Sequence, residues 1–426
     1  MRLLAVLPLL LATPAIAQTQ PDPARLKASV EKLVGFGTRH TLSDTDHPTR
    51  GIGAARRWFA TELTWIGADC QCIEVANIAR TFANERAPKG VEVVDVVGFQ
   101  PGQDPKRVVI VMGHIDSRVT DPMNSTADAP GANDDASGVA LVLEAARILS
   151  KEKFDATIVY AALSGEEQGL FGGQLLAETA KERGWTVSAV LNNDIVGNTI
   201  GQGGARVADR VRVFSEGIRQ VESLDEQLAR RADGGEDDGP SRALAKAIDG
   251  VAGALPKGLD VLLVRRPDRF GRGGDHSPFL KLGYPAVRFT VGVENYDAQH
   301  QDLRTEKGRV YGDTVDRMDF AYLAKVTAIN VATIRQLAKA PAAPTRVTIG
   351  GALASDSSVA WDPVPGALGY RVHWRRADAQ DWQHHIDVNA NQATLKGVIV
   401  DDHFVGVSAL GADGAESLVT FGGRQR

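Results

Sequence analysis

The chain has 426 residues, of which 43% are hydrophobic, so it is long enough for two domains and can bury a large core. Its formal net charge of −5 at pH 7 leaves no basic excess, which excludes a nucleic-acid partner held through phosphate neutralisation. The two cysteines, Cys70 and Cys72, are too few for a disulfide framework or a thiolate zinc site, so any metal must be held by histidine and carboxylate. Whether these two cysteines pair stays open.

The N-terminus has the features of a secretory signal peptide. Arg2 precedes the apolar run 3–11, and the small residues Ala15 and Ala17 stand where a signal peptidase reads them. We therefore expect residues 1–17 to be removed and the protein to be periplasmic or extracellular. The apolar run is too short to span a bilayer, and no later segment reaches that length, so we expect no stable membrane insertion.

The first half of the mature chain alternates between two patterns. Apolar residues three or four apart predict helices at 21–35, 56–66, 138–149 and 170–183, the third capped by Ser137. Valine-rich or continuously apolar runs predict strands at 91–99, 107–113, 156–163 and 187–191. This alternation predicts a three-layer α/β/α domain with a mixed, mostly parallel sheet.

The second half of this domain is less regular. Residues 200–240 are polar with glycine-rich ends, which favours a surface insertion or a lid near the site. Beyond them the pattern predicts helices at 241–251 and 320–337 and strands at 260–264 and 285–291. The expected domain therefore runs over residues 18–340.

Composition changes at the alanine- and proline-rich stretch 339–344, which is typical of a linker. Residues 341–426 then show strand-like alternation, turn signals and three of the six tryptophans, which predicts a separate all-β sandwich. This region resembles a fibronectin type III domain in its Trp361 strand, its Tyr370-x-Val372-x-Trp374 strand and its Leu395-x-Gly397 turn.

Chemistry-bearing residues follow three of the predicted strands. His114 comes directly after one apolar run, Glu166 and Glu167 follow the next, and Asp194 follows a third. Open α/β sheets bind their ligands at the carboxyl ends of parallel strands, so these side chains are expected to meet. Their position supports a site independently of their chemistry.

The residue types are those of a metal-assisted hydrolase. Two metal ions can share one water, lower its pKa and polarise the scissile carbonyl, which needs a bridging carboxylate, further ligands and a separate base. That set is available as His114, Asp134, Glu166, Glu167, Asp194 and one later histidine. Asp116, two residues after His114 on an extended chain, is expected to accept the hydrogen bond from the imidazole nitrogen that holds no metal.

Four motifs in order resemble the co-catalytic zinc aminopeptidases. They are Gly-His-x-Asp-Ser at 113–117, Gly-Ala-Asn-Asp-Asp-Ala-Ser-Gly at 131–138, Gly-Glu-Glu-x-Gly-Leu-x-Gly at 165–172 and Asn-Asp at 193–194. This family includes bacterial leucyl aminopeptidases, aminopeptidase Y and glutamate carboxypeptidase-like and glutaminyl cyclase-like branches. The resemblance covers roughly residues 85–335.

The resemblance implies two zinc ions per chain. It implies that His114 and Asp194 hold one ion, that Glu167 and a late histidine hold the other, and that Asp134 bridges them. Glu166 would be the general base, and the peptide bond after Asp134 is expected to be cis, as is frequent in the family.

Two histidines compete for the last ligand position. His276 precedes Ser-Pro-Phe, a segment that the family uses for support at the start of a helix, whereas His300 follows the last predicted strand. We favour His300, with Asp302 expected to orient it. Glu294, in the same loop, is a candidate to receive the α-amino group of the substrate.

The expected function is that of an exported two-zinc exopeptidase, an aminopeptidase that cleaves N-terminal residues from peptides through a metal-bridging water. A carboxypeptidase of the same family is the alternative, since an arginine cluster can hold a carboxylate and four arginines lie close in sequence, at Arg265, Arg266, Arg269 and Arg272. A metal-free binding protein of the same fold is a third hypothesis, which the complete ligand set disfavours. The sequence leaves the oligomeric state open.

Overall fold

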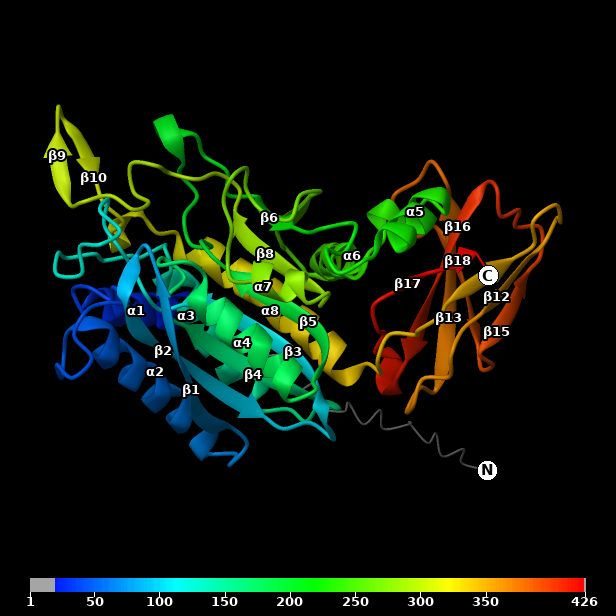
Figure 1. Cartoon of the computed structure of the whole chain (residues 1–426), viewed down its shortest axis with the longest axis horizontal. Coiled ribbons are helices and arrows are strands. Elements are labelled where there is room, and N and C mark those ends of the chain that lie inside the picture. Colours follow the sequence, from blue (N-terminus) through cyan, green and yellow to red (C-terminus); the bar gives the residue numbers. More distant parts are fainter. Residues whose placement is uncertain (1–19, 425–426) are drawn as a thin grey trace, which may run out of the picture.

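A computed structural model describes residues 20–424, so the signal peptide expected at 1–17 lies outside the described residues. Figure 1 shows a large α/β part and, beside it, a smaller part made of strands. Among the described residues no helix combines the length and apolar character that a membrane crossing requires. The domain limits expected at residues 340 and 341 fall directly after the last long helix of the α/β part.

The α/β part is built from helices and strands in alternation. Its helices are α1 (Pro23–Val34), α2 (Gly51–Ala68), α3 (Ala136–Leu149), α4 (Phe171–Glu182), α5 (Leu224–Ala232), α6 (Pro240–Ala254), α7 (Ser277–Lys281) and α8 (Phe320–Lys339). Its main strands are β1 (Glu74–Asn84), β2 (Ala87–Gln100), β3 (Asp104–His114), β4 (Ala156–Leu163), β5 (Thr186–Asn193), β6 (Arg210–Phe214), β7 (Asp260–Val264) and β8 (Ala286–Val291). A separate hairpin joins β9 (Arg304–Glu306) to β10 (Arg309–Tyr311).

The eight main strands form one sheet in the order β1-β2-β4-β3-β5-β8-β6-β7. Its centre is parallel, since β3 runs parallel to both β4 and β5, and β5 runs parallel to β8. The edges are mixed: β1, β2 and β4 pair antiparallel in succession, and β6 is antiparallel to β8. The predicted mixed, mostly parallel sheet is therefore confirmed.

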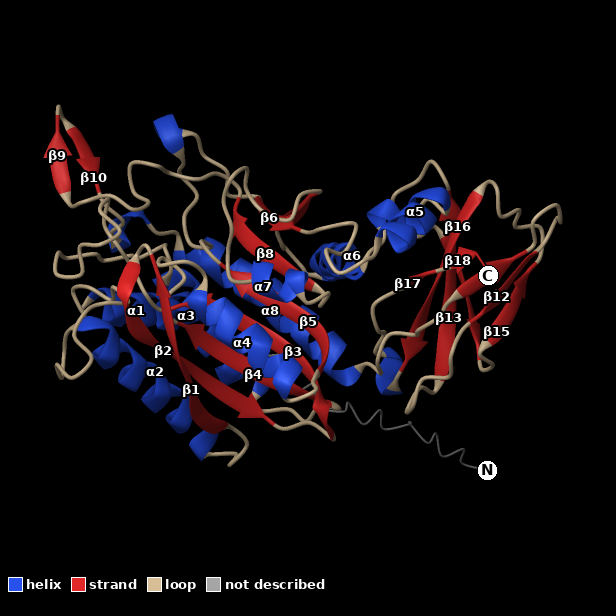
Figure 2. Ribbon diagram, viewed as in Figure 1, coloured by secondary structure: helices blue, strands red, loops and turns tan. Residues whose placement is uncertain are grey.

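The central strands are apolar throughout because both of their faces are covered. In β3, Val109 and Val111 pack into a core shared with α1, α2, α3, α6 and α8. Val108, Ile110 and Met112 point the other way and pack with residues of α4 and α7. This alternation is the two-residue period of a strand, and it produces the three-layer α/β/α arrangement (Figure 2).

Some elements differ from the sequence-based expectation. The side chain that caps α3 is Asp135, which accepts from the Gly138 N–H, and not Ser137, whose hydroxyl donates to the Asn133 carbonyl. The edge strand β1 was not predicted. The segment expected as an insertion or lid contains β6, a member of the main sheet, and α5, which lies beside the C-terminal strands (Figure 1).

The C-terminal part is the expected all-β sandwich. One sheet has the order β15-β12-β11-β18 and the other β14-β13-β16-β17. The strands are β11 (Thr348–Gly350), β12 (Ser357–Ala360), β13 (Gly369–Arg376), β14 (His384–Val388), β15 (Gln392–Leu395), β16 (His403–Leu410), β17 (Thr420–Phe421) and β18 (Gly423–Arg424). Trp361 and Tyr370 meet edge to face inside it, with ring centres 5.2 Å apart, in an apolar core of its own.

A buried ion pair joins the sandwich to the α/β part. Arg375 on β13 lies 2.6 Å from Asp238, just before α6, and the two side chains are only 2% and 4% exposed. The guanidinium is also stacked between aromatic rings, 4.6 Å from the centre of Trp382 and 4.9 Å from that of Phe404. Lys246 on α6 makes a second contact with Asp238, at 2.8 Å.

The sandwich docks at the end of the sheet where the parallel strands begin. A cleft between the two parts is lined by Thr186, the first residue of β5, by Pro285, which precedes β8, and by sandwich residues 417–421. The chemistry-bearing residues follow the opposite ends of the strands. β5 has eight residues, so the two ends lie roughly 25 Å apart at the usual rise per residue.

We expect Arg375→Met to lower the free energy of unfolding by about 3 kcal/mol, because it leaves the buried Asp238 carboxylate with Lys246 as its remaining cationic partner. Urea unfolding followed by tryptophan fluorescence measures the effect. The matched control is Arg376→Met on the same strand, since Arg376 is 61% exposed and pairs with the exposed Asp378, a contact of small energetic weight. Equal losses in the two variants would contradict a special role for the buried pair.

Candidate metal centre

The chemistry-bearing side chains gather at the carboxyl ends of the parallel strands. His114 ends β3, Glu166 and Glu167 follow β4, Asp194 follows β5, Asp134 precedes α3, and His300 lies in the loop after β8. His300 has a φ of +56°, in the left-handed region that residues other than glycine seldom adopt. The peptide bond between Asp134 and Asp135 is cis.

Asp134 lies between two histidines. Its Oδ1 is 3.0 Å from His114 Nε2, and its Oδ2 is 2.9 Å from His300 Nε2. Each histidine has a second carboxylate nearby, with Asp194 Oδ1 at 3.9 Å from His114 Nε2 and Glu167 Oε1 at 3.1 Å from His300 Nε2. One carboxylate thus faces two ligand sets with its two oxygens, which is the arrangement a bridging ligand requires.

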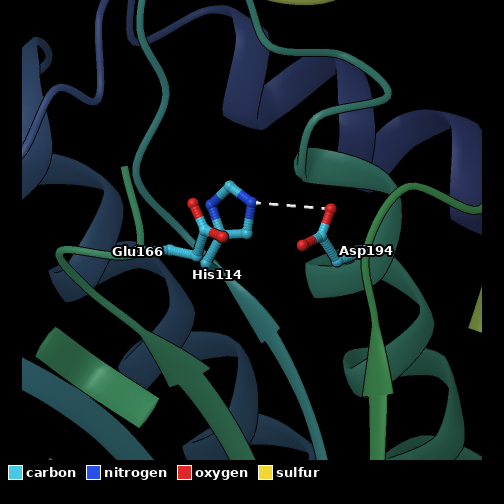
Figure 3. Close-up of side chains that lie close together, drawn as sticks. All are labelled: His114, Glu166 and Asp194. Atoms are coloured by element: carbon cyan, nitrogen blue, oxygen red, sulfur yellow. Dashed lines mark ion pairs between the residues drawn. The ribbon is translucent and has the colours of Figure 1, made fainter. Parts of the chain in front are cut away.

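The polar atoms fall into two groups of three that could each hold a cation. One contains His114, Glu166 and Asp194, with ligand atoms all within 4.8 Å of one another, and Figure 3 shows these side chains together. The other contains Asp134, Glu167 and His300 within the same limit. The structure therefore brings together every ligand predicted from the sequence.

The site residues fit zinc on their own properties. Within the described part of the chain, the buried atoms His114 Nε2 and Glu167 Oε1 have no hydrogen-bond partner. Buried polar atoms are costly unless something satisfies them, and a cation between these atoms would do so. Imidazole nitrogen and carboxylate oxygen are the ligands from which catalytic zinc sites without cysteine are made.

Asp116 contacts both His114 and the loop that carries Glu166 and Glu167. His114 Nδ1 lies 3.1 Å from the backbone carbonyl of Asp116 and 3.5 Å from its carboxylate. The same carboxylate accepts hydrogen bonds from the Thr41 hydroxyl and from the backbone N–H groups of Glu166 and Glu167. Asp116 therefore fixes both the first histidine and the loop that carries the two glutamates.

Glu166 has the electrostatics of a proton acceptor that a nearby cation would activate. Burial raises its pKa well above that of an ordinary glutamate, and the Glu167 and Asp194 carboxylates raise it further, although His114 opposes them. A positive ion in the site would counter this effect by favouring the ionised form. In Asp134 the contacts with His300 and His114 outweigh burial, so its pKa lies well below the usual range.

The chain is similar to known zinc metalloproteases. A probable zinc metalloprotease from Leptosphaeria maculans is 42% identical over 405 residues, which cover 93% of this chain and 94% of the relative. The profile of Peptidase family M28 matches residues 95–232, which contain the motifs around His114, Asp134, Glu166 and Asp194. The chain belongs to the zinc metalloproteases of peptidase family M28.

Solved structures agree with this family at the level of the fold. An aminopeptidase from Aneurinibacillus sp. strain AM-1 has a TM-score of 0.52 at 15% identity, over 75% of this chain and 95% of that one. A glutaminyl cyclase from Fimbriiglobus ruber has a TM-score of 0.52 at 18% identity, over 76% and 99% of the two chains. The M28 fold therefore carries both activities among these neighbours, and the fold alone does not decide between them.

Several residues that shape the site in this M28 chain lie outside the sequence motifs. Arg39 is 1% exposed and donates to the backbone carbonyls of Leu33, Ile115, Pro130 and Gly131. It joins the segments that follow His114 and precede Asp134, and burial lowers its pKa to about 10.

The backbone that presents Asp134 is held by another residue that sequence reasoning missed. The Asp313 carboxylate accepts hydrogen bonds from the backbone N–H groups of Asn133 and Asp134, at 2.8–3.0 Å. Burial raises the pKa of Asp313 to about 6. Gln299, next to His300, donates to Asp134 Oδ2 at 3.1 Å.

Two arginines contact the candidate metal ligands directly. Arg288 Nη2 lies 2.7 Å from Asp194 Oδ1, and Arg288 Nε donates to the Asp194 carbonyl. Arg118 Nε donates to Glu167 Oε2 at 2.7 Å, and Arg118 Nη2 lies 2.6 Å from His300 Nδ1. Asp302 was expected to orient His300, but it is exposed, and the imidazole contact belongs to Arg118.

Two further candidates lie outside the two ligand groups. His276 Nε2 contacts the Pro267 carbonyl at 2.8 Å, and its nearest carboxylate is Asp268, so the structure places His300 and not His276 beside Asp134. Glu294 is 6% exposed and is surrounded by arginines, with contacts of 2.8–3.4 Å to Arg212, Arg269 and Arg272. A substrate ammonium group would have to compete with these three cations.

Proposed function

We propose that the chain is a two-zinc exopeptidase that removes N-terminal residues from peptides. The observation that carries the proposal is the Asp134 carboxylate, whose two oxygens face two histidines at 3.0 and 2.9 Å. Each histidine has one further carboxylate as its companion, Asp194 for His114 and Glu167 for His300. One ion on each side would complete two sites that share Asp134.

Zinc held by these residues would supply a Lewis acid that lowers the pKa of water and polarises the scissile carbonyl. Glu166 then accepts a proton from the attacking water and returns it to the leaving amine, a role for which its place beside His114 and Asp194 suits it. Asp116 keeps the N–H of His114 at Nδ1, which leaves Nε2 free to ligate. Arg288 orients the Asp194 carboxylate.

The N-terminal specificity is supported by neighbours of the same fold, among them the aminopeptidase from Aneurinibacillus. A second candidate is a carboxypeptidase, which the arginines around Glu294 favour. Arg272 is 32% exposed and contacts both Glu294 and Gln299, and Gln299 reaches Asp134, so a positive charge lies near the scissile position. A free substrate carboxylate would suit this charge.

Dipeptides blocked at one end separate the two specificities. We expect alanyl-leucinamide to be cleaved and N-acetyl-alanyl-leucine to resist, with a chelator abolishing cleavage and added zinc restoring it. Elemental analysis is expected to give two zinc ions per chain. Cleavage of the N-acetylated peptide alone would replace the aminopeptidase by the carboxypeptidase, and full activity in the chelator would overturn both.

We also propose that the protein is exported, to the periplasm or outside the cell, through residues 1–17. The charged start, the apolar run and the small residues at Ala15 and Ala17 support this. A disulfide between Cys70 and Cys72 is compatible with an oxidising compartment. The sandwich is proposed to be a fibronectin type III-like module, supported by its two four-stranded sheets and its buried Trp361.

A further inference from the structure

Large apolar side chains are exposed in the loops around the candidate metal centre. Among the described residues fifteen such side chains are exposed, and six of them stand in these loops: Met123, Ile200, Phe270, Tyr296, Leu303 and Val310. None of the six belongs to a hydrophobic core cluster of the described chain. Single exposed apolar groups are common, but several of them around one place mark a surface that binds something apolar. We call these six side chains the apolar rim.

The loops of the apolar rim meet at segment 294–302, which follows β8 and carries one of the two candidate ligand histidines. The Tyr296 N–H donates to Gln202 Oε1 at 3.0 Å, which joins this segment to the loop after β5. The Asp297 carbonyl accepts from the Gly312 N–H at 3.0 Å, which joins it to the β9–β10 hairpin. Figure 1 shows this hairpin projecting from the α/β part at the end away from the sandwich.

Two further loops meet the same segment. The Asp302 N–H donates to Thr120 Oγ1 at 3.4 Å, which joins it to the loop after β3. Arg272 Nη1 lies 3.1 Å from Glu294 Oε2, which joins it to the loop after β7. All four loops therefore contact the segment that holds His300, and the apolar rim surrounds the candidate metal centre.

The pocket beside Asp134 is too small for a long peptide. Its volume is about 320 Å³, at the lower end for ligand pockets, and Asn198, Gln299 and Arg317 are among the residues that line it. One residue of a peptide fills such a space. In an exopeptidase this is the terminal residue, so the residues beyond it have to lie across the surrounding loops, where the apolar rim stands.

We propose that the apolar rim binds the residues of a peptide substrate beyond its terminal one, so that the enzyme prefers peptides of four or more residues with large apolar side chains there. The occupant is a peptide because the rim surrounds the place where the cleaved bond has to lie. Phe270, Tyr296 and Val310 are 87%, 56% and 58% exposed, and covering them with apolar residues removes both surfaces from water. The inference names the substrate class of the proposed exopeptidase and rests on that function.

Two tetrapeptide amides test the preference, alanyl-alanyl-phenylalanyl-leucinamide and alanyl-alanyl-seryl-serinamide. They share the bond that is cleaved first, so the initial release of alanine compares only the residues beyond that bond. The zinc-loaded wild type is expected to have a KM at least about 10-fold lower for the apolar peptide, because its phenylalanine and leucine are covered by the rim. The kcat values should be similar, since the reacting groups are the same.

Phe270→Ser and Tyr296→Ser are each expected to raise the KM for the apolar peptide by about 3–10-fold and to leave kcat unchanged, because they remove contact area only. The KM for the serine peptide and for alanyl-leucinamide should not change. Trp65→Ser is the matched control, because Trp65 is an aromatic residue on α2, 67% exposed and outside these loops, and it should change no constant. Circular dichroism checks that each variant keeps its fold.

Equal KM values for the two tetrapeptides in the wild type would overturn the substrate role of the apolar rim while keeping the exopeptidase. A rise in KM for alanyl-leucinamide in Tyr296→Ser as large as that for the apolar peptide would also overturn it, because the metal centre itself would then be disturbed. Binding to phosphatidylcholine vesicles that Phe270→Ser abolishes, with every peptide KM unchanged, would replace the peptide by a lipid surface. If the zinc-loaded protein cleaves no peptide at all, the proposed function fails and the inference fails with it.

Discussion

Glu166→Gln is expected to reduce kcat by a factor of about 10²–10⁴, the range that a positioned general base contributes, while both zinc ions stay bound. The amide is similar in shape to the carboxylate but cannot take up the proton of the attacking water. Because Glu166 lies beside the ligands His114 and Asp194, metal content must be measured on the same sample by elemental analysis. A large loss of kcat with unchanged metal content would assign the loss to proton transfer.

The control for this variant is Glu31→Gln on α1, because the side chain of Glu31 is 53% exposed and contacts only Lys27 among charged groups of the described chain. It should leave kcat, KM and metal content unchanged. If Glu166→Gln kept near-full peptidase activity with both ions bound, Glu166 could not be the base, and the proposed mechanism would fail.

Asp134→Ala is expected to lose zinc from both proposed metal positions, the one beside His114 and the one beside His300. Without zinc, no turnover should be measurable. One oxygen of Asp134 faces His114 and the other faces His300, so its removal is expected to take a ligand from each ion at once. Removing even an outer partner of a metal ligand costs about 10–100-fold in affinity, so each site should weaken by more than that. Zinc titration of the variant measures both constants.

Asp128→Ala is the matched control, because Asp128 stands in the preceding loop, is 62% exposed and pairs with Arg50 on the surface. If Asp134→Ala lost only one of the two zinc ions, Asp134 would be a ligand of that ion alone, which would contradict the bridging role.

Four of the candidate site residues could be predicted because the motifs that carry them follow largely apolar runs, whereas Asp134 and His300 were expected from the resemblance to the aminopeptidases. Such a run marks a strand buried on both faces, and the carboxyl ends of parallel strands meet at one edge. This reasoning placed His114, Glu166, Glu167 and Asp194 at the same edge, where the structure has them. It also located β3, β4 and β5 to within a few residues.

The supporting residues could not be predicted, because their partners are distant in sequence and arginine or aspartate in a loop has no pattern. Asp313 holds the backbone of Asn133, 180 residues away, and Arg39 reaches Ile115 across 76 residues. Arg118 stands four residues after His114, yet its partners are Glu167 and His300. Such contacts are set by how loops fold over the sheet, which local periodicity does not encode.

The sequence also could not show which of two neighbouring polar residues caps a helix. Either Ser137 or Asp135 could begin α3, and Asp135 does so while it also accepts from the backbone N–H of His114, 21 residues away. β6 was missed because its five residues alternate arginine with apolar side chains inside a polar segment, a pattern too short to separate from a loop. The same limit hid β1 at the edge of the sheet.

The sandwich is attached at the end of the sheet opposite to the candidate metal centre. Arg375 and Asp238 hold it on the α/β part, and the shared cleft lies where β5 and β8 begin, about the length of a strand away from Asp194. A partner that bound the sandwich would therefore lie at the other end of the sheet from Asp194, and the edge that carries the candidate site would stay open to incoming peptides.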